Sequence, residues 1–178
     1  MLWIYKRWSL ALGLAWLLWS FCPVSAKDLS DSRSGCHLTV PDDWMIPPPE
    51  GSNPRILKAV SGKLASGKAV TLTICPVPPQ IKPEMMPAFI LEVNKQLETE
   101  ITNTGAKITA HDRQKMGDYE FNIFSASHAY PVGDINSSIW ITFVGGNMYE
   151  IVIANLNSDP LKEADLVAVL KSFAIAQK

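Results

Sequence analysis

One segment near the C-terminal end, residues 139–153, constrains the fold more than any other part of the chain. Apolar side chains occupy every second position of 139–143 and again of 149–153, and Gly145-Gly146-Asn147 stands between the two runs. Alternation with a period of two is typical of β-strands, and paired glycines supply the positive φ angles of a tight hairpin turn. The segment therefore predicts an antiparallel hairpin, and with it an antiparallel sheet.

Further strands are expected on both sides of a central helix. Five other segments have strand composition or alternation, namely 36–40, 55–61, 69–75, 107–115 and 119–123. From about Glu84 to Thr102 the apolar residues follow the i, i+3, i+4, i+7 spacing of one helical face. These residues are Met86, Phe89, Ile90, Val93, Leu97 and Ile101.

A second helix is expected close to the end of the chain. Ser158 or Asp159 can cap it, with Pro160 in its first turn. Its buried stripe consists of Leu166, Val169, Leu170 and Phe173. The element order is then βββαββββα, which predicts an α+β fold in which two helices pack on one antiparallel-rich sheet.

The first 26 residues resemble a secretory signal peptide. Lys6 and Arg7 precede a charge-free apolar run over 8–21, and small residues end the segment at Ala26. We expect cleavage after Ala26, which places the rest of the chain in the periplasm or outside the cell. In the alternative, the segment stays uncleaved as a membrane anchor, because its charge-free stretch is of borderline length for spanning a bilayer.

The chain after the signal segment is expected to form one domain. Residues 27–35 are polar and predict a flexible lead-in, and residues 36–178 predict a single folded domain. Composition agrees, since 47% of the chain is apolar and 19% is charged. Without residues 1–26, 14 basic residues stand against 17 acidic ones, a net charge of about −3. This balance argues against nucleic acid or an anionic membrane as a partner.

Two cysteines remain in this domain. An even pair in an oxidising compartment more often forms a disulfide than a metal or redox site. We therefore predict a Cys36–Cys75 bond, which requires that strands 36–40 and 69–75 be neighbours.

Residues suited to catalysis or metal binding are few. His37, His111 and His128 form no pair at helical i, i+4 spacing, and no Cys-x-x-Cys is present. Ser125, Ser127 and His128 are too close in sequence to make a catalytic triad by themselves. We expect no catalytic residue, no metal site and no cofactor.

Two tryptophans are candidate partner-binding residues. Trp44 follows the acidic turn at 42–43, and Trp140 lies on the strand face opposite Ile139 and Ile141. Aromatic side chains often anchor protein interfaces. In the alternative, both simply pack in the core beneath a helix.

Four short motifs carry a family resemblance. They are TVPDDW at 39–44, MGDYEF at 116–121, GGNMYEI at 145–151 and VLKSF at 169–173. With the element order, they resemble the PsbP-like family, which includes the extrinsic photosystem subunit and the DcrB-like periplasmic lipoproteins. The resemblance implies an α/β/α sandwich that works by binding a partner rather than by catalysis. The chain departs from the lipoprotein members, because bulky residues precede Cys22 where a lipid-attachment signal has a small one.

Together these features predict an exported, non-enzymatic binding or accessory protein of the cell envelope. It would act through contact with another envelope or secreted protein, and would meet a membrane only if the N-terminal segment stays uncleaved. Two alternatives remain open. An exported hydrolase would need a cleft where Ser, His and acidic side chains converge, and a small-molecule carrier would need an apolar cavity between helix and sheet.

Overall fold

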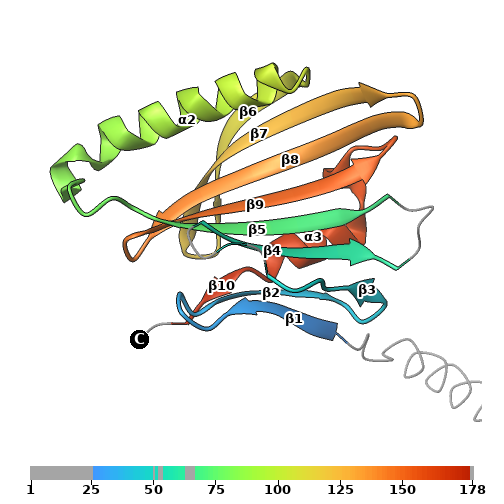
Figure 1. Cartoon of the computed structure of the whole chain (residues 1–178), viewed down its shortest axis with the longest axis horizontal. Helices are drawn as coiled ribbons and strands as arrows, with labels where there is room; N and C mark the ends of the chain where they lie inside the picture. Colours follow the sequence, from blue (N-terminus) through green and yellow to red (C-terminus); the bar gives the residue numbers. More distant parts are fainter. Residues whose placement is uncertain (1–25, 50, 52–53, 63–66, 177–178) are drawn as a thin grey trace, which may run out of the picture.

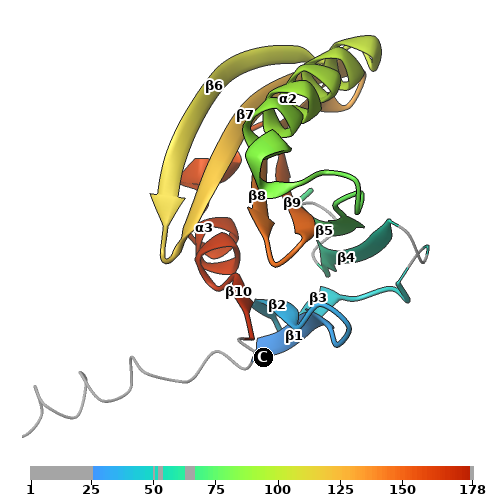
Figure 2. The ribbon, with the colours of Figure 1, turned by 90° about the vertical axis from the view of Figure 1, so that its left-hand side faces the viewer.

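A computed structural model describes residues 26–49, 51, 54–62 and 67–176. The expected signal peptide lies outside the described residues, apart from Ala26. Figure 1 shows a large antiparallel sheet with one helix, α2 (Met86–Asn103), on one face. A second helix, α3 (Ala164–Lys171), lies with a small sheet on the other face. The turned view in Figure 2 separates these layers. This arrangement is the α+β fold that the sequence predicts, although two sheets are present instead of one.

The large sheet has seven strands in the order β3-β4-β5-β9-β8-β7-β6, and all neighbours are antiparallel. Its strands are β3 (Trp44–Met45), β4 (Arg55–Ser61), β5 (Ala69–Pro76), β6 (Lys107–Met116), β7 (Tyr119–Tyr130), β8 (Gly133–Val144) and β9 (Asn147–Leu156). The β8–β9 hairpin confirms the strongest sequence prediction. Gly145 and Gly146 form its turn with φ angles of 58° and 77°.

Both faces of this hairpin are covered. Ile139 pairs with Val152 and Ile141 with Glu150, on the face beneath α2. Trp140 pairs with Ile151 on the opposite face, which belongs to the main core. The apolar runs of β8 and β9 therefore lie on opposite faces of the sheet, because the register offsets them by one residue.

The small sheet corrects the prediction of a flexible lead-in at 27–35. It has the order β1-β2-β10, with strands β1 (Ala26–Asp31), β2 (Cys36–Pro41) and β10 (Ala174–Ile175). β1 pairs with β2 along its whole length, and Leu29 and Asp31 are buried. Backbone pairing and these two side chains order a segment whose composition is otherwise polar.

The helices agree with the sequence prediction except at the start of the second. Helix α2 spans Met86–Asn103 after a short 3-10 helix at Pro83–Met85. Helix α3 spans only Ala164–Lys171. Pro160 instead belongs to a separate 3-10 helix, Pro160–Lys162, in which the Asp159 side chain accepts a hydrogen bond from the Leu161 backbone N–H. Within the described residues, no helix is both long enough and apolar enough to cross a membrane.

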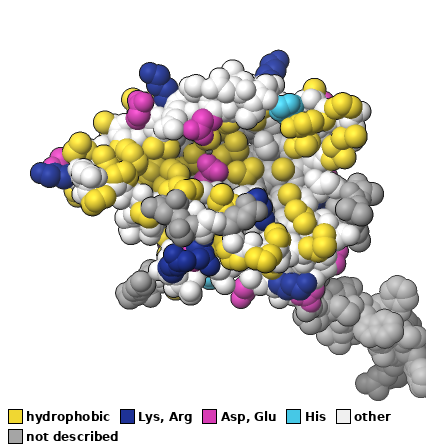
Figure 3. Space-filling model, in the orientation of Figure 1, with side chains coloured by type: hydrophobic (Ala, Val, Ile, Leu, Met, Phe, Trp, Pro, Cys, Tyr) yellow, Lys and Arg dark blue, Asp and Glu magenta, His cyan; other side chains and the backbone are white. Residues whose placement is uncertain are grey.

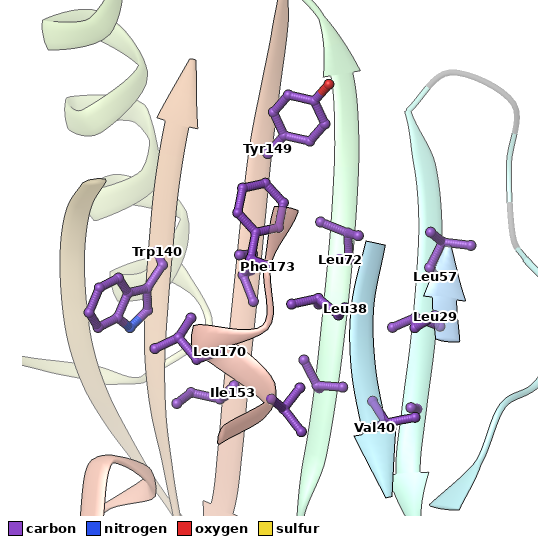
Figure 4. Close-up of a cluster of buried hydrophobic side chains, with 14 of the residues drawn as sticks. Leu29, Leu38, Val40, Leu57, Leu72, Trp140, Tyr149, Ile153, Leu170 and Phe173 are labelled. Carbon is purple, nitrogen blue, oxygen red and sulfur yellow. The ribbon is translucent and has the colours of Figure 1, made fainter. Parts of the chain in front are cut away.

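The main core lies between the large sheet on one side and α3 with the small sheet on the other (Figure 4). Phe121 is at its centre, with ring centroids 5.6 Å from Trp140 and 5.9 Å from Phe173. A smaller cluster on the other face of the sheet joins Ile101 of α2 to Phe124. The sheet is therefore packed on both faces, and more extensively on the α3 side.

Both candidate partner-binding tryptophans belong to the main core, so this prediction is wrong. Trp44 is 2% exposed and Trp140 is 4% exposed. The Trp140 indole N–H donates to the Ser138 hydroxyl over 2.8 Å. Neither ring can reach a partner at the surface, and both instead pack in the core, which is the alternative that the sequence leaves open.

The predicted Cys36–Cys75 disulfide is also wrong. Both cysteines are free thiols, and their strands β2 and β5 belong to different sheets. Val70, Leu72 and Ile74 of β5 point into the main core, so Cys75, at an odd position, points to the α2 side. Cys36 is buried in the core on the opposite side of the large sheet.

Candidate functional site

An open groove of about 250 Å³ lies between α2 and the large sheet. Figure 3 shows hydrophobic side chains gathered below α2, with acidic side chains among them. The apolar lining consists of Pro76, Val77, Phe89, Val93, Leu97, Ile141 and Met148. The polar lining consists of Cys75, Gln96, Glu100 and Glu150. The groove thus combines an apolar surface with two carboxylates.

The groove exists because α2 does not press against the sheet along its whole length. Only Asn94 and Ile101 of this helix are buried, and the apolar residues of its first half are half-buried or exposed. An edge contact between the Phe89 and Phe143 rings, with centroids 6.0 Å apart, supports that half. Beneath it, β5 offers small or polar side chains that cannot fill the space to the helix.

The electrostatics of the groove centre on Glu150. This residue lies on β9 between its partners Ile141 on β8 and Thr73 on β5. Burial raises the pKa of the Glu150 carboxyl, and the nearby Glu100 carboxylate raises it further. A side-chain hydrogen bond with Thr73 acts in the opposite direction. In the folded protein the ionised form of Glu150 is therefore unfavourable in free energy, unless a proton or a cation neutralises it.

Cys75 is the thiol of the groove. Burial raises its pKa, and the charge of Glu150 adds to this effect. A raised thiol pKa lowers the thiolate fraction at neutral pH and slows nucleophilic reactions. Cys75 is therefore not a candidate nucleophile, but its rate of chemical modification can report whether the groove is accessible.

This difference between the two thiols gives a first prediction. N-ethylmaleimide added to the native protein at pH 7 should modify Cys75 and leave Cys36 unmodified, because only Cys75 is accessible. Glu150→Gln removes a charge that raises the thiol pKa and should speed Cys75 modification roughly two- to fivefold. Mass spectrometry of the labelled peptides gives both rates. Glu92→Gln, on an exposed part of α2, is the matched control.

Two results would contradict this prediction. One is modification of Cys36 as fast as that of Cys75 in the native protein. The other is that both thiols resist modification until a reductant is added, which would indicate that Cys36 and Cys75 form a disulfide after all.

A second polar cluster joins the two sheets. Asp31 on β1 lies 2.7 Å from the Arg55 guanidinium on β4, measured from Oδ1 to Nε. The Ser34 backbone N–H and hydroxyl both donate to the other Asp31 oxygen. The Ser34 hydroxyl oxygen also lies 3.1 Å from the Cys36 sulfur, and burial raises the pKa of the Cys36 thiol. Asp31 and Arg55 thus neutralise each other within the protein, and the cluster leaves neither charge for a ligand.

The histidines do not come together. His37 is on β2, while His111 stacks on Phe124 with ring centroids 4.1 Å apart and lies 3.3 Å from a Glu98 carboxylate oxygen. His128 stacks on Tyr130. Among the residues that the structure describes, no group of three or more His, Cys, Asp or Glu side chains is arranged to hold a metal ion.

A second hollow, of about 320 Å³, lies near β10 and the turns that follow β6 and β8. Its tyrosine hydroxyls are already bonded. Tyr119 accepts from the Ile175 backbone N–H over 3.1 Å, and Tyr149 accepts from the Asn147 amide over 3.4 Å. The groove under α2 is the stronger candidate, because its carboxylates have no cationic partner in the described part of the chain.

Solved structures show which fold this geometry belongs to. The chain is similar to the solution structure of cyanobacterial PsbP (CyanoP) from Synechocystis sp. PCC 6803, with a TM-score of 0.60. The match covers 88% of this chain and 95% of that chain at 12% sequence identity. The chain has a PsbP-like fold. A crystal structure from Bacteroides thetaiotaomicron VPI-5482 is also similar, with a TM-score of 0.59, 12% identity and coverage of 85% of this chain and 49% of that chain.

The PsbP-like fold confirms the resemblance that the four sequence motifs indicate. No protein-family model matches the chain, and no curated protein matches it in sequence. The likeness at 12% identity therefore concerns the backbone architecture. The groove under α2 and its two carboxylates are described from this chain's own residues.

Proposed function

We propose that this protein is an exported, non-enzymatic binding protein of the cell envelope that acts by contact with another protein. The observation that carries the proposal is the open apolar groove between α2 and the large sheet. Apolar side chains that line an open surface raise the free energy of the isolated protein unless a partner covers them. Covering them would supply binding energy to a protein partner.

The size and openness of the groove favour a protein segment over a small molecule. Small-molecule sites typically enclose about 300–1,000 Å³ and bury most of the ligand. The groove is smaller, about 250 Å³, and opens to solvent along one side of α2. A side chain or two from a partner segment would fill it, while the rest of the segment rests on the surrounding surface.

The N-terminal segment that precedes the folded domain supports export. Lys6 and Arg7, the apolar run 8–21 and the small residues at 24–26 have the order of a signal peptide. Cleavage after Ala26 would leave Lys27 as the first residue, within β1. Mass spectrometry of the protein from the producing cell tests this step directly, since an intact Met1 would indicate a membrane anchor instead.

Photo-crosslinking tests the binding role. A photo-reactive amino acid at Gln96, which is exposed and lines the groove, should give one discrete adduct in the envelope fraction. The same amino acid at Lys95, which is exposed on α2 but does not line the groove, should give none. Cys75→Trp, which fills the groove, should abolish the adduct while circular dichroism and melting stay those of a folded protein.

The proposal fails if positions 96 and 95 behave alike. Adducts at both positions would indicate unspecific contact, and an absence of adducts at both would indicate that the groove has no protein partner in the cell.

A further inference from the structure

The charges in the groove indicate the chemistry of its partner. Resting on the function proposed above, we infer that the groove binds a peptide segment of another protein whose apolar side chains flank a lysine or arginine, and that this cation pairs with Glu150 and Glu100. The peptide would place its apolar side chains against the groove walls and its cationic group between the two carboxylates.

The position of the carboxylates is the first observation. Glu150 projects from β9 into the groove, and Glu100 projects from α2 above it. Glu150 is partly buried, and both the loss of hydration and the nearby Glu100 charge disfavour its charged form. A lysine or arginine between the two carboxylates would offset the electrostatic penalty on Glu150.

A comparison within the protein is the second observation. Three other acidic side chains, Asp31, Glu163 and Asp165, each form an ion pair with a basic residue of the chain. Asp31 pairs with Arg55, and Lys68 lies 2.8 Å from carboxylate oxygens of both Glu163 and Asp165.

Neither carboxylate of the groove has such a partner among the described residues. Glu100 instead accepts a hydrogen bond from the Gln96 amide over 3.0 Å, and Glu150 has a hydrogen bond with Thr73. The groove thus holds one partly buried carboxylate, Glu150, and one exposed carboxylate, Glu100, without a matching positive charge from the described residues.

The apolar side chains that line the groove restrict further which ligands could fill it. A lone metal ion or a small amine would meet Phe89, Val93 and Met148 without covering them. Lysine and arginine side chains carry an apolar stem of three or four methylene groups below the charged head. Such a stem suits the walls, and apolar neighbours in the same peptide would cover the rest.

Selection from a random peptide library tests the inference even while the natural partner is unidentified. A phage-displayed library of random dodecapeptides is selected on the full-length protein, and peptides that protect Cys75 from N-ethylmaleimide are kept as groove binders. These peptides should contain a lysine or arginine between apolar residues. Fluorescence anisotropy should show about tenfold weaker binding to Glu150→Gln, and weaker binding to Glu100→Gln.

Matched controls separate this effect from general attraction to an acidic protein. Glu92→Gln removes the same charge from an exposed position of α2 and should change the affinity less than twofold. Replacing the basic residue of the peptide with norleucine should weaken binding to the wild-type protein about tenfold and have little further effect on Glu150→Gln. Circular dichroism establishes that each variant is folded.

The outcomes distinguish this inference from the proposed function. Groove-binding peptides that lack a basic residue, or that bind Glu150→Gln and the wild-type protein equally, would overturn the inference and leave a protein-binding groove. Failure to obtain any peptide that protects Cys75, together with no adduct at position 96, would overturn both.

Discussion

Phe121→Ala should lower the free energy of unfolding by about 3–5 kcal/mol, the usual cost of removing a phenyl ring from a packed core. Phe121 is fully buried, and its ring meets Trp140 of β8 and Phe173 just after α3. Its loss leaves a cavity where the large sheet and the last helix meet. Chemical denaturation, followed by tryptophan fluorescence and by circular dichroism, measures the change.

Tyr130→Ala provides the control for this prediction. Tyr130 is an aromatic residue at the end of the same strand, β7, but it is 46% exposed. Its replacement should cost less than about 1 kcal/mol. Equal effects of the two substitutions would mean that the aromatic cluster does not form the centre of the core.

Asp31→Ala should cost about 3 kcal/mol of stability at pH 7, because it leaves Arg55 without its buried partner. The Asp31 side chain is 3% exposed, and that of Arg55 is 23% exposed, so the lower end of the range for a broken buried pair applies. The substitution also removes the acceptor of two Ser34 hydrogen bonds. Asp28→Ala, at an exposed position of the same strand, should be nearly neutral.

The effect of Asp31→Ala should depend on pH in a defined direction. Burial alone would raise the pKa of Asp31, but the hydrogen bonds from Ser34 and the charge of Arg55 together hold it below its ordinary value. A lowered carboxyl pKa contributes stability above the unfolded value of about 3.9, and this stability is lost as the pH falls through the folded value. The stability difference between wild type and variant should therefore shrink below about pH 4. A difference that grows on acidification would assign the effect to another group.

The sequence is informative wherever local pattern decides structure. The helix at 86–103 and the part of the β8–β9 hairpin at 139–153 follow from apolar spacing and from the glycines at 145–146. The α+β class and the PsbP-like fold follow from these elements and from the four motifs, although the predicted order βββαββββα lacks the strands β1, β3 and β10. Local pattern suffices in these cases because the residues that determine each element are neighbours along the chain.

The errors concern contacts between distant segments. The polar run at 27–35 predicts a loose chain, yet β1 is held by pairing with β2 and by Arg55, which comes 24 residues after Asp31. The disulfide prediction rests on the number of cysteines and the compartment, which do not specify the sheet or the face on which each one lies. Trp140 does lie on the face opposite its apolar neighbours, but both faces of the sheet are covered.

The groove could not be predicted from the sequence. It depends on the distance between α2 and the sheet, which is set by packing at Ile101 and Phe143 rather than by any motif. Glu150 stands at a polar position of an alternating strand, which usually indicates a solvated face. The sequence holds one signal of the groove. The apolar stripe at 86–101 must pack against one face of the sheet, and Glu150 lies on that face.

The three-stranded sheet also determines when the chain can finish folding. β2 is completed on one side by β1 and on the other by β10, which is among the last described residues. The Thr39 backbone N–H donates to the Ser172 hydroxyl over 2.7 Å, across 133 positions of sequence. Closing such distant contacts slows folding. For a protein exported as we propose, nearly the whole chain must leave the ribosome before its core can close, which keeps it unfolded and competent for translocation during synthesis.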